Sequence, residues 1–85
     1  MVMTLAIGIM GPKFQIIDSN NVRYSVQNIT NEGHRLYSIN NLNGHYAEIS
    51  YNGAVWTEMW NSAFIPPFVY DLHLIGNLIK DHEGF

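Results

Sequence analysis

The dipeptide Asn52-Gly53 lies between two runs of alternating apolar and polar residues, and it restricts the fold more than any other feature of the chain. Asn-Gly in this setting is the strongest short-range signal for a β-hairpin with a two-residue turn. Such a turn would place two pairs of residues opposite each other: Tyr51 with Ala54, and Ile49 with Trp56. The hairpin therefore predicts an antiparallel sheet in which Trp56 lies on the apolar face.

Two further loops contain residues suited to the left-handed backbone conformation. Residues 19–21 would form one three-residue loop with Asn21 left-handed, and residues 42–44 a second with Gly44 in the bulge position. We prefer these lengths because they collect the apolar side chains on one side, and a slip of one residue would turn every side chain over. The predicted core face carries Phe14, Ile16, Val22, Tyr24, Val26, Tyr37, Ile39, Ala47, Ile49, Tyr51, Ala54 and Trp56. The reverse face, expected to be mostly solvated, carries Tyr46, Glu48, Ser50, Val55, Thr57 and Met59.

Residues 2–10 also alternate, which predicts a first strand that ends at Gly11-Pro12. This run is about half the length needed to cross a bilayer. It also lacks the basic start and the small-residue cleavage site of a signal peptide. We therefore expect a strand of the mature fold. Since residues 2–9 contain no Lys, Glu or Pro, this strand would be an unprotected edge.

The apolar period changes after Pro66-Pro67 to the value typical of a helix, with Pro67 suited to its first turn and Gly84 at its end. The main apolar stripe consists of Phe68, Leu72, Ile75 and Ile79. Leu74 and Leu78 lie off this stripe and widen the apolar arc. The helix is therefore expected either to wrap around a twisted sheet or to present Leu74 and Leu78 to a second subunit.

These patterns predict one α+β domain over residues 1–85. Its architecture would be an antiparallel meander sheet of five or six strands with one C-terminal helix packed on one face, in two layers. The strands are expected at about 2–10, 13–17, 22–29, 34–41, 45–51 and 54–60, and the helix at about 67–82.

The composition limits the classes of partner. The 85 residues include no cysteine, which fits a reducing compartment such as the cytoplasm. The net charge is −3, and the four Lys and Arg residues are scattered, so nucleic-acid binding is disfavoured. Charged residues make up 13% of the chain, so few charges oppose contact with another protein. The abundance of asparagine beside so few charges is typical of compact, AT-rich genomes such as those of phages.

No residue pattern indicates a catalytic or metal site. The four histidines are His34, His45, His73 and His82. The last two point to opposite sides of the predicted helix, and the first two are out of step on neighbouring strands, so no metal ligand set is expected. Glu48 and Glu58 are predicted on opposite faces, which argues against paired-carboxylate hydrolysis. We expect neither enzymatic activity nor a cofactor.

Aromatic residues crowd the segment that leads from the last strand into the helix: Trp60, Phe64, Phe68 and Tyr70, with Met59 beside them. Either Trp60 and Phe64 close the open end of the core, or some of these residues form a binding patch or line a pocket between sheet and helix. Trp, Tyr and Met are enriched at interfaces. Arg35 falls on the core face at the start of a strand, where it must find a partner or extend out to water. Together with Tyr24 and Tyr37 it could orient a ligand.

Two functional hypotheses follow. The first is a non-enzymatic protein-interaction module that associates with itself, most simply as a two-fold dimer. If the chain comes from a phage, such a module would act by inhibiting a host protein. The alternative is a small-ligand binding or sequestering protein for a nucleotide or metabolite, with its pocket at the sheet–helix or subunit interface. The candidate binding residues are Arg35, Tyr37, Trp60, Phe64, Tyr70, Leu74 and Leu78. Neither hypothesis involves nucleic acid or a membrane.

Overall fold

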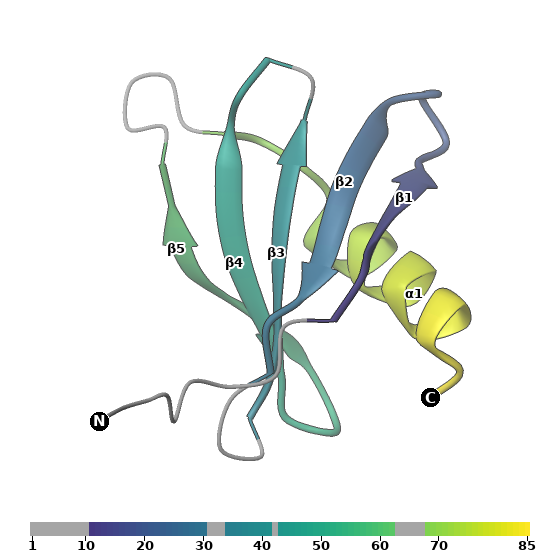
Figure 1. The fold of residues 1–85 in the computed structure, drawn as a ribbon, viewed down its shortest axis with the longest axis vertical. Coiled ribbons are helices and arrows are strands. Elements are labelled where there is room, and N and C mark those ends of the chain that lie inside the picture. The colour runs from purple at the N-terminus through teal and green to yellow at the C-terminus, as the bar shows by residue number, and fades with distance from the viewer. Residues whose placement is uncertain (1–10, 31–33, 42, 63–67) are drawn as a thin grey trace.

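A computed structural model describes residues 11–30, 34–41, 43–62 and 68–85. These residues form five strands and one helix: β1 (Lys13–Ile17), β2 (Arg23–Asn28), β3 (Arg35–Asn41), β4 (Tyr46–Tyr51), β5 (Trp56–Asn61) and α1 (Leu72–Glu83). The strands lie in the order β1-β2-β3-β4-β5, each antiparallel to its neighbours, and α1 covers one face of the sheet (Figure 1). The predicted α+β meander is therefore confirmed. The strand predicted at 2–10 lies outside the described residues.

The loop between β1 and β2 has the predicted length. Ile16 pairs with Tyr24, and Asn21 is left-handed with φ 63°. The Asp18 carboxylate holds the loop by accepting hydrogen bonds from the backbone N–H groups of Asn20 and Val22, each at 2.9 Å. Val22 itself was wrongly predicted in the core: it is exposed because it lies beside the loop, before β2 begins.

The loop between β3 and β4 also follows the prediction. Tyr37 pairs with Ile49 and Ile39 with Ala47, and Gly44 has φ 84°. All four paired side chains are fully buried beneath α1. The choice of register by burial of the apolar side chains was therefore correct for this hairpin.

The turn at Asn52-Gly53 differs from the prediction. Tyr51 pairs with Trp56, so the loop contains four residues, 52–55, instead of two. The Asn52 side chain explains the length, since its Oδ1 accepts hydrogen bonds from the backbone N–H groups of Ala54 at 2.8 Å and Val55 at 2.9 Å. The register moves by two residues, an even number, so Trp56 stays on the core face while Ala54 moves into the loop and is exposed.

A bulge then reverses the facing of the end of β5. Ile49 pairs with Glu58, but Glu48, which directly precedes Ile49 in β4, pairs with Trp60. Met59 is therefore the extra residue on β5. Trp60 consequently shares the face of Glu48, the face of the sheet turned away from α1, which we call the open face. Of the two alternatives for Trp60, closing the end of the core is therefore wrong, because the side chain is exposed on the open face.

The helix begins later than predicted, at Leu72 instead of about residue 67. Asp71 is its N-cap, and the Asp71 carboxylate accepts a hydrogen bond from the Leu74 N–H at 3.0 Å. Phe68 lies before the helix, outside any helix or strand, and the Asn61 side chain is hydrogen-bonded to its backbone N–H and C=O. The predicted Phe68 is thus in the core, but not as part of a helical stripe.

The helix packs on the sheet through Gly76. A Cβ atom at this position would lie 2.3 Å from Nε1 of Trp56, so only glycine lets the helix backbone rest on the indole. The buried core consists of Ile16, Tyr24, Val26, Tyr37, Ile39, Ala47, Ile49, Trp56, Phe68, Ile75 and Ile79. The prediction that Trp56 belongs to the core is confirmed.

Candidate functional site

The predicted binding residues do not form one site. Tyr37 is fully buried in the core, and its hydroxyl donates a hydrogen bond to Glu83 Oε1 at 2.9 Å. Burial raises the pKa of Tyr37 to about 12; the neighbouring Arg35 opposes this shift and Glu83 adds to it. Tyr37 therefore joins α1 to the sheet. Phe64 lies outside the described residues.

The two leucines beside the main stripe of α1 are both half-buried. Leu78 packs against the core cluster, which agrees with a helix that wraps around the sheet. Leu74 lies one turn earlier, near the N-cap of the helix. A contact of either leucine with a second subunit stays a prediction.

The aromatic residues near β5 lie on two different faces. Trp60 is 48% exposed on the open face, where its ring meets Tyr46 edge-on with centroids 5.7 Å apart. Tyr70 is half-buried beside the core, and its hydroxyl donates a hydrogen bond to Glu58. Burial, followed by the hydrogen bond to Glu58 and the Glu58 charge, raises the pKa of Tyr70. The aromatic residues that are crowded together in the sequence are therefore divided between two faces by the bulge at Met59.

β5 is an edge strand with an unusual surface. Its outer edge is not paired with any strand of the described residues, and four consecutive side chains, 57–60, are exposed. Natural edge strands are usually protected by lysine, proline or short length. β5 has one charged residue, Glu58, which lies between Thr57 and Met59, and Met59 is 58% exposed. This combination is typical of a strand that pairs with another chain.

The backbone pattern shows which groups of β5 face outward. The Asn52 N–H donates to the Val55 carbonyl at 3.3 Å, so this pair is hydrogen-bonded within the hairpin. Hydrogen-bonded pairs alternate along an antiparallel ladder. Thr57 is therefore bonded inward to β4, whereas the N–H and C=O groups of Trp56 and Glu58 point away from the sheet.

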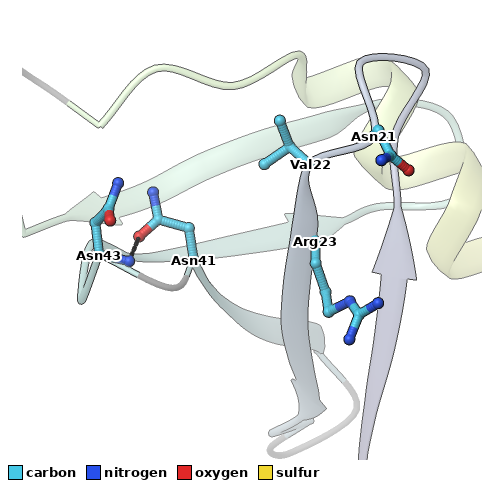
Figure 2. Close-up of a pocket in the computed structure, with 5 residues that line it drawn as sticks. All are labelled: Asn21, Val22, Arg23, Asn41 and Asn43. Atoms are coloured by element: carbon cyan, nitrogen blue, oxygen red, sulfur yellow. Dashed lines mark hydrogen bonds between the residues drawn. The ribbon is translucent and has the colours of Figure 1, made fainter.

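A hollow between the β1–β2 and β3–β4 loops does not have the form of a ligand site. It is lined by Asn21, Val22, Arg23, Asn41 and Asn43. Figure 2 shows the Val22 side chain on the side of Asn41, whereas the Asn21 and Arg23 side chains extend toward β1. The Asn41 amide is occupied locally, because its Oδ1 accepts a hydrogen bond from the Asn43 N–H at 2.9 Å. Small-ligand sites require polar groups that converge, and these groups diverge.

A second hollow has more specific chemistry, and we call it the Arg35 hollow. It is lined by His34, Arg35, Tyr51, Asn52, Gly53 and Phe85. The Arg35 side chain leaves the core face, as expected for a charge at a strand start, and its guanidinium carbon lies 3.8 Å from the centre of the Phe85 ring. Nearby, Lys80 Nζ lies 3.2 Å from the Tyr51 hydroxyl. Sequence reasoning identified Arg35 but missed Phe85. The one sequence signal for Phe85 is that an aromatic residue follows Gly84 at the end of the predicted helix.

Other chemistry is not indicated by the part of the chain that the structure describes. Within it, no three His, Asp or Glu residues are grouped so that they could hold a metal ion. His45 lies 3.4 Å from the Asn41 amide, and His82 stacks on Phe14 with ring centroids 3.7 Å apart. No described helix is long and apolar enough to cross a membrane.

Comparisons of the chain with protein-family models, curated proteins and solved structures find no match. A functional proposal must therefore start from the geometry of the described residues. Two features depart from an ordinary protein surface: the outer edge of β5 and the Arg35 hollow.

Proposed function

We propose that this protein is a non-enzymatic interaction module that associates with itself by antiparallel pairing of β5 with β5 of a second copy. The observation that supports it is the outer edge of β5, which is unpaired among the described residues and carries four consecutive exposed side chains. An edge of this kind offers backbone hydrogen bonds to a further strand. The pairing would be isologous, about a two-fold axis.

A register centred on Thr57 fits this edge. It pairs Trp56 of one copy with Glu58 of the other, and these are the residues whose backbone groups point outward. It also brings Val55 near Met59 of the second copy, and both are about half exposed in the single chain. A register centred on Glu58 would instead place two carboxylates opposite each other, which is unfavourable.

The side chains next to this edge suit a protein contact. Met59 and Trp60 belong to residue types that are enriched at interfaces, and both are exposed here. Sparse charge on β5 adds little repulsion against a second copy. The same edge could accept a strand of a different protein, so inhibition of a host protein by this route stays a prediction.

A cysteine at Thr57 tests the register, because the chain has no other cysteine. Opposed residues of a non-hydrogen-bonded antiparallel pair have Cα atoms about 4.5 Å apart. That distance lies in the range of about 4.4–6.8 Å that a disulfide spans. Under mild oxidation, Thr57→Cys should give a covalent dimer in non-reducing electrophoresis. The control Ser38→Cys, on the open face of the central strand β3, should stay monomeric.

Native mass spectrometry of the unmodified protein provides the second measurement. We expect a dimer of the 9.7 kDa chain, and Thr57→Lys should convert it to monomer by placing two ammonium groups opposite each other. Asn20→Lys adds the same charge at an exposed residue of the loop between β1 and β2, at the opposite edge of the sheet, so this variant should remain dimeric. A monomeric wild-type protein, or equal cross-linking of the two cysteine variants, would contradict the proposal.

A further inference from the structure

We propose that the Arg35 hollow binds an oxyanion, the phosphate or carboxylate group of a small ligand. The Arg35 guanidinium would hold it through two parallel N–H donors. This site lies at the end of the sheet where β3 begins, and it does not depend on the pairing of β5.

Stacking on Phe85 occupies a face of the Arg35 guanidinium, and one donor is directed to the Tyr37 hydroxyl, which leaves the other donors for a ligand. The guanidinium carbon lies 3.8 Å from the centre of the Phe85 ring, so the ring covers a face of the planar group. The five N–H donors of a guanidinium lie in its plane and point outward from its edges. A face-on stack therefore orients the group without using those donors, and its edge matches the two oxygens of a carboxylate or phosphate.

Arg35 forms no ion pair with a carboxylate among the described residues. The ion pair that these residues do form joins His82 to Glu83. Glu83 has the side-chain carboxylate nearest to Phe85 in the sequence, but this carboxylate is already hydrogen-bonded. Its Oε1 accepts hydrogen bonds from the Tyr37 hydroxyl at 2.9 Å and from Asn28 Nδ2 at 3.1 Å. The positive charge of Arg35 is thus not neutralised by an ion pair within the described fold.

The surroundings of Arg35 add positive charge and polar groups. Lys80 Nζ lies 5.0 Å from the centre of the Tyr51 ring, and Tyr51 lines the hollow, so a second of the four Lys and Arg residues contacts its wall. His34 and the Asn52-Gly53 segment line the same hollow. Its volume of about 460 Å³ is within the usual range of small-ligand pockets, about 300–1,000 Å³.

Arg23 provides a matched control for this site. It is also an exposed arginine at the start of a strand, and the hollow beside it has side chains that diverge (Figure 2). None of the described aromatic rings stacks on its guanidinium. If oxyanion binding needs the oriented guanidinium and not a positive charge alone, Arg35 should respond to an anion and Arg23 should not.

The test is a titration of the ¹⁵N-labelled protein with inorganic phosphate, and separately with succinate, at constant ionic strength. We expect the Arg35 Nε–H signal to shift in a saturable way with at least one of the two anions, while the Arg23 signal stays still. Saturation by phosphate alone would assign a phosphate ligand, and saturation by succinate alone a carboxylate ligand. No saturable shift, or equal shifts of both arginines, would overturn the proposal.

Variants give an independent readout by isothermal titration calorimetry with the anion that saturates. Arg35→Gln should weaken binding by about tenfold or more, because the charge-assisted hydrogen bonds are lost. Arg35→Lys should also weaken it, since an ammonium group lacks the planar pair of donors. Arg23→Gln removes the same charge and should bind as the wild type does. Thr57→Lys should bind equally well, so failure of the β5 proposal and failure of this one can be told apart.

Discussion

Two tryptophans on β5 have similar neighbours but opposite exposures. Trp56 contacts Tyr37 and Trp60 contacts Tyr46, with ring centroids 5.8 and 5.7 Å apart. Each tyrosine hydroxyl donates to a carboxylate, at 2.9 Å for Tyr37 and 2.7 Å for Tyr46. Yet Trp56 is 7% exposed and Trp60 is 48% exposed.

The bulge at Met59 causes this difference, because it places the two tryptophans on opposite faces of one strand. On the core face, α1 closes over Trp56 through Gly76. On the open face, no described element covers Trp60. The same residue types therefore stabilise the fold on one face and remain available for contacts on the other.

The largest difference should appear when each tryptophan is truncated. Trp56→Ala should lower the free energy of unfolding by about 3–5 kcal/mol, because it empties a core site beneath the helix. Trp60→Ala should change it by about 0.5 kcal/mol or less, as is usual at exposed positions. Urea unfolding followed by circular dichroism measures both. Equal losses would mean that the open face is covered in solution.

Gly76→Ala gives the next largest effect. In an exposed helix this change would stabilise by about 1 kcal/mol, since glycine is a poor helix former. Here the added Cβ would overlap the Trp56 indole, so we expect a loss of about 1–3 kcal/mol from overpacking. Asn77→Ala, on the exposed side of the same helix, is the control and should be neutral or stabilising. A stabilised Gly76→Ala would show that the helix does not rest on Trp56.

Sequence reasoning succeeded where burial decides the structure. The registers of the first hairpin and of the β3–β4 hairpin follow from collecting the apolar residues on one face. It failed at the Asn52 loop. The predicted register and the observed one differ by two residues, and both bury Trp56, so the apolar pattern cannot distinguish between them. There the Asn52 side chain, bonded to the Ala54 and Val55 backbone, favours the longer loop.

The candidate sites were harder to predict than the fold. A bulge leaves no mark in an alternating sequence, so the position of Trp60 on the open face could not be foreseen. Arg35 was identified because a charge on a core-facing position must be explained. Its stacking partner Phe85 depends on the left-handed Gly84, φ 82°, that ends α1 and redirects the chain.

The smallest effect compares the two tyrosines at alkaline pH. Burial is the main cause that raises the pKa of both Tyr37 and Tyr46 to about 12, from an ordinary value of 10.0. A raised pKa means that the folded state holds the proton more tightly than the unfolded state does. The stability from each tyrosine is therefore fully present below pH 10 and is lost as the pH rises toward 12.

Replacing each tyrosine by phenylalanine should separate the two faces. Tyr37→Phe removes a fully buried hydroxyl and its hydrogen bond to Glu83, which should cost about 1 kcal/mol at neutral pH. It should also flatten the fall of the urea midpoint above pH 10. Tyr46→Phe should do both to a lesser extent, because water reaches Tyr46 on the open face and screens Glu48. A larger effect at Tyr46 would indicate that its hydroxyl is buried by contact with another chain. In that case, adding Thr57→Lys, which should separate the two copies, would remove the extra effect.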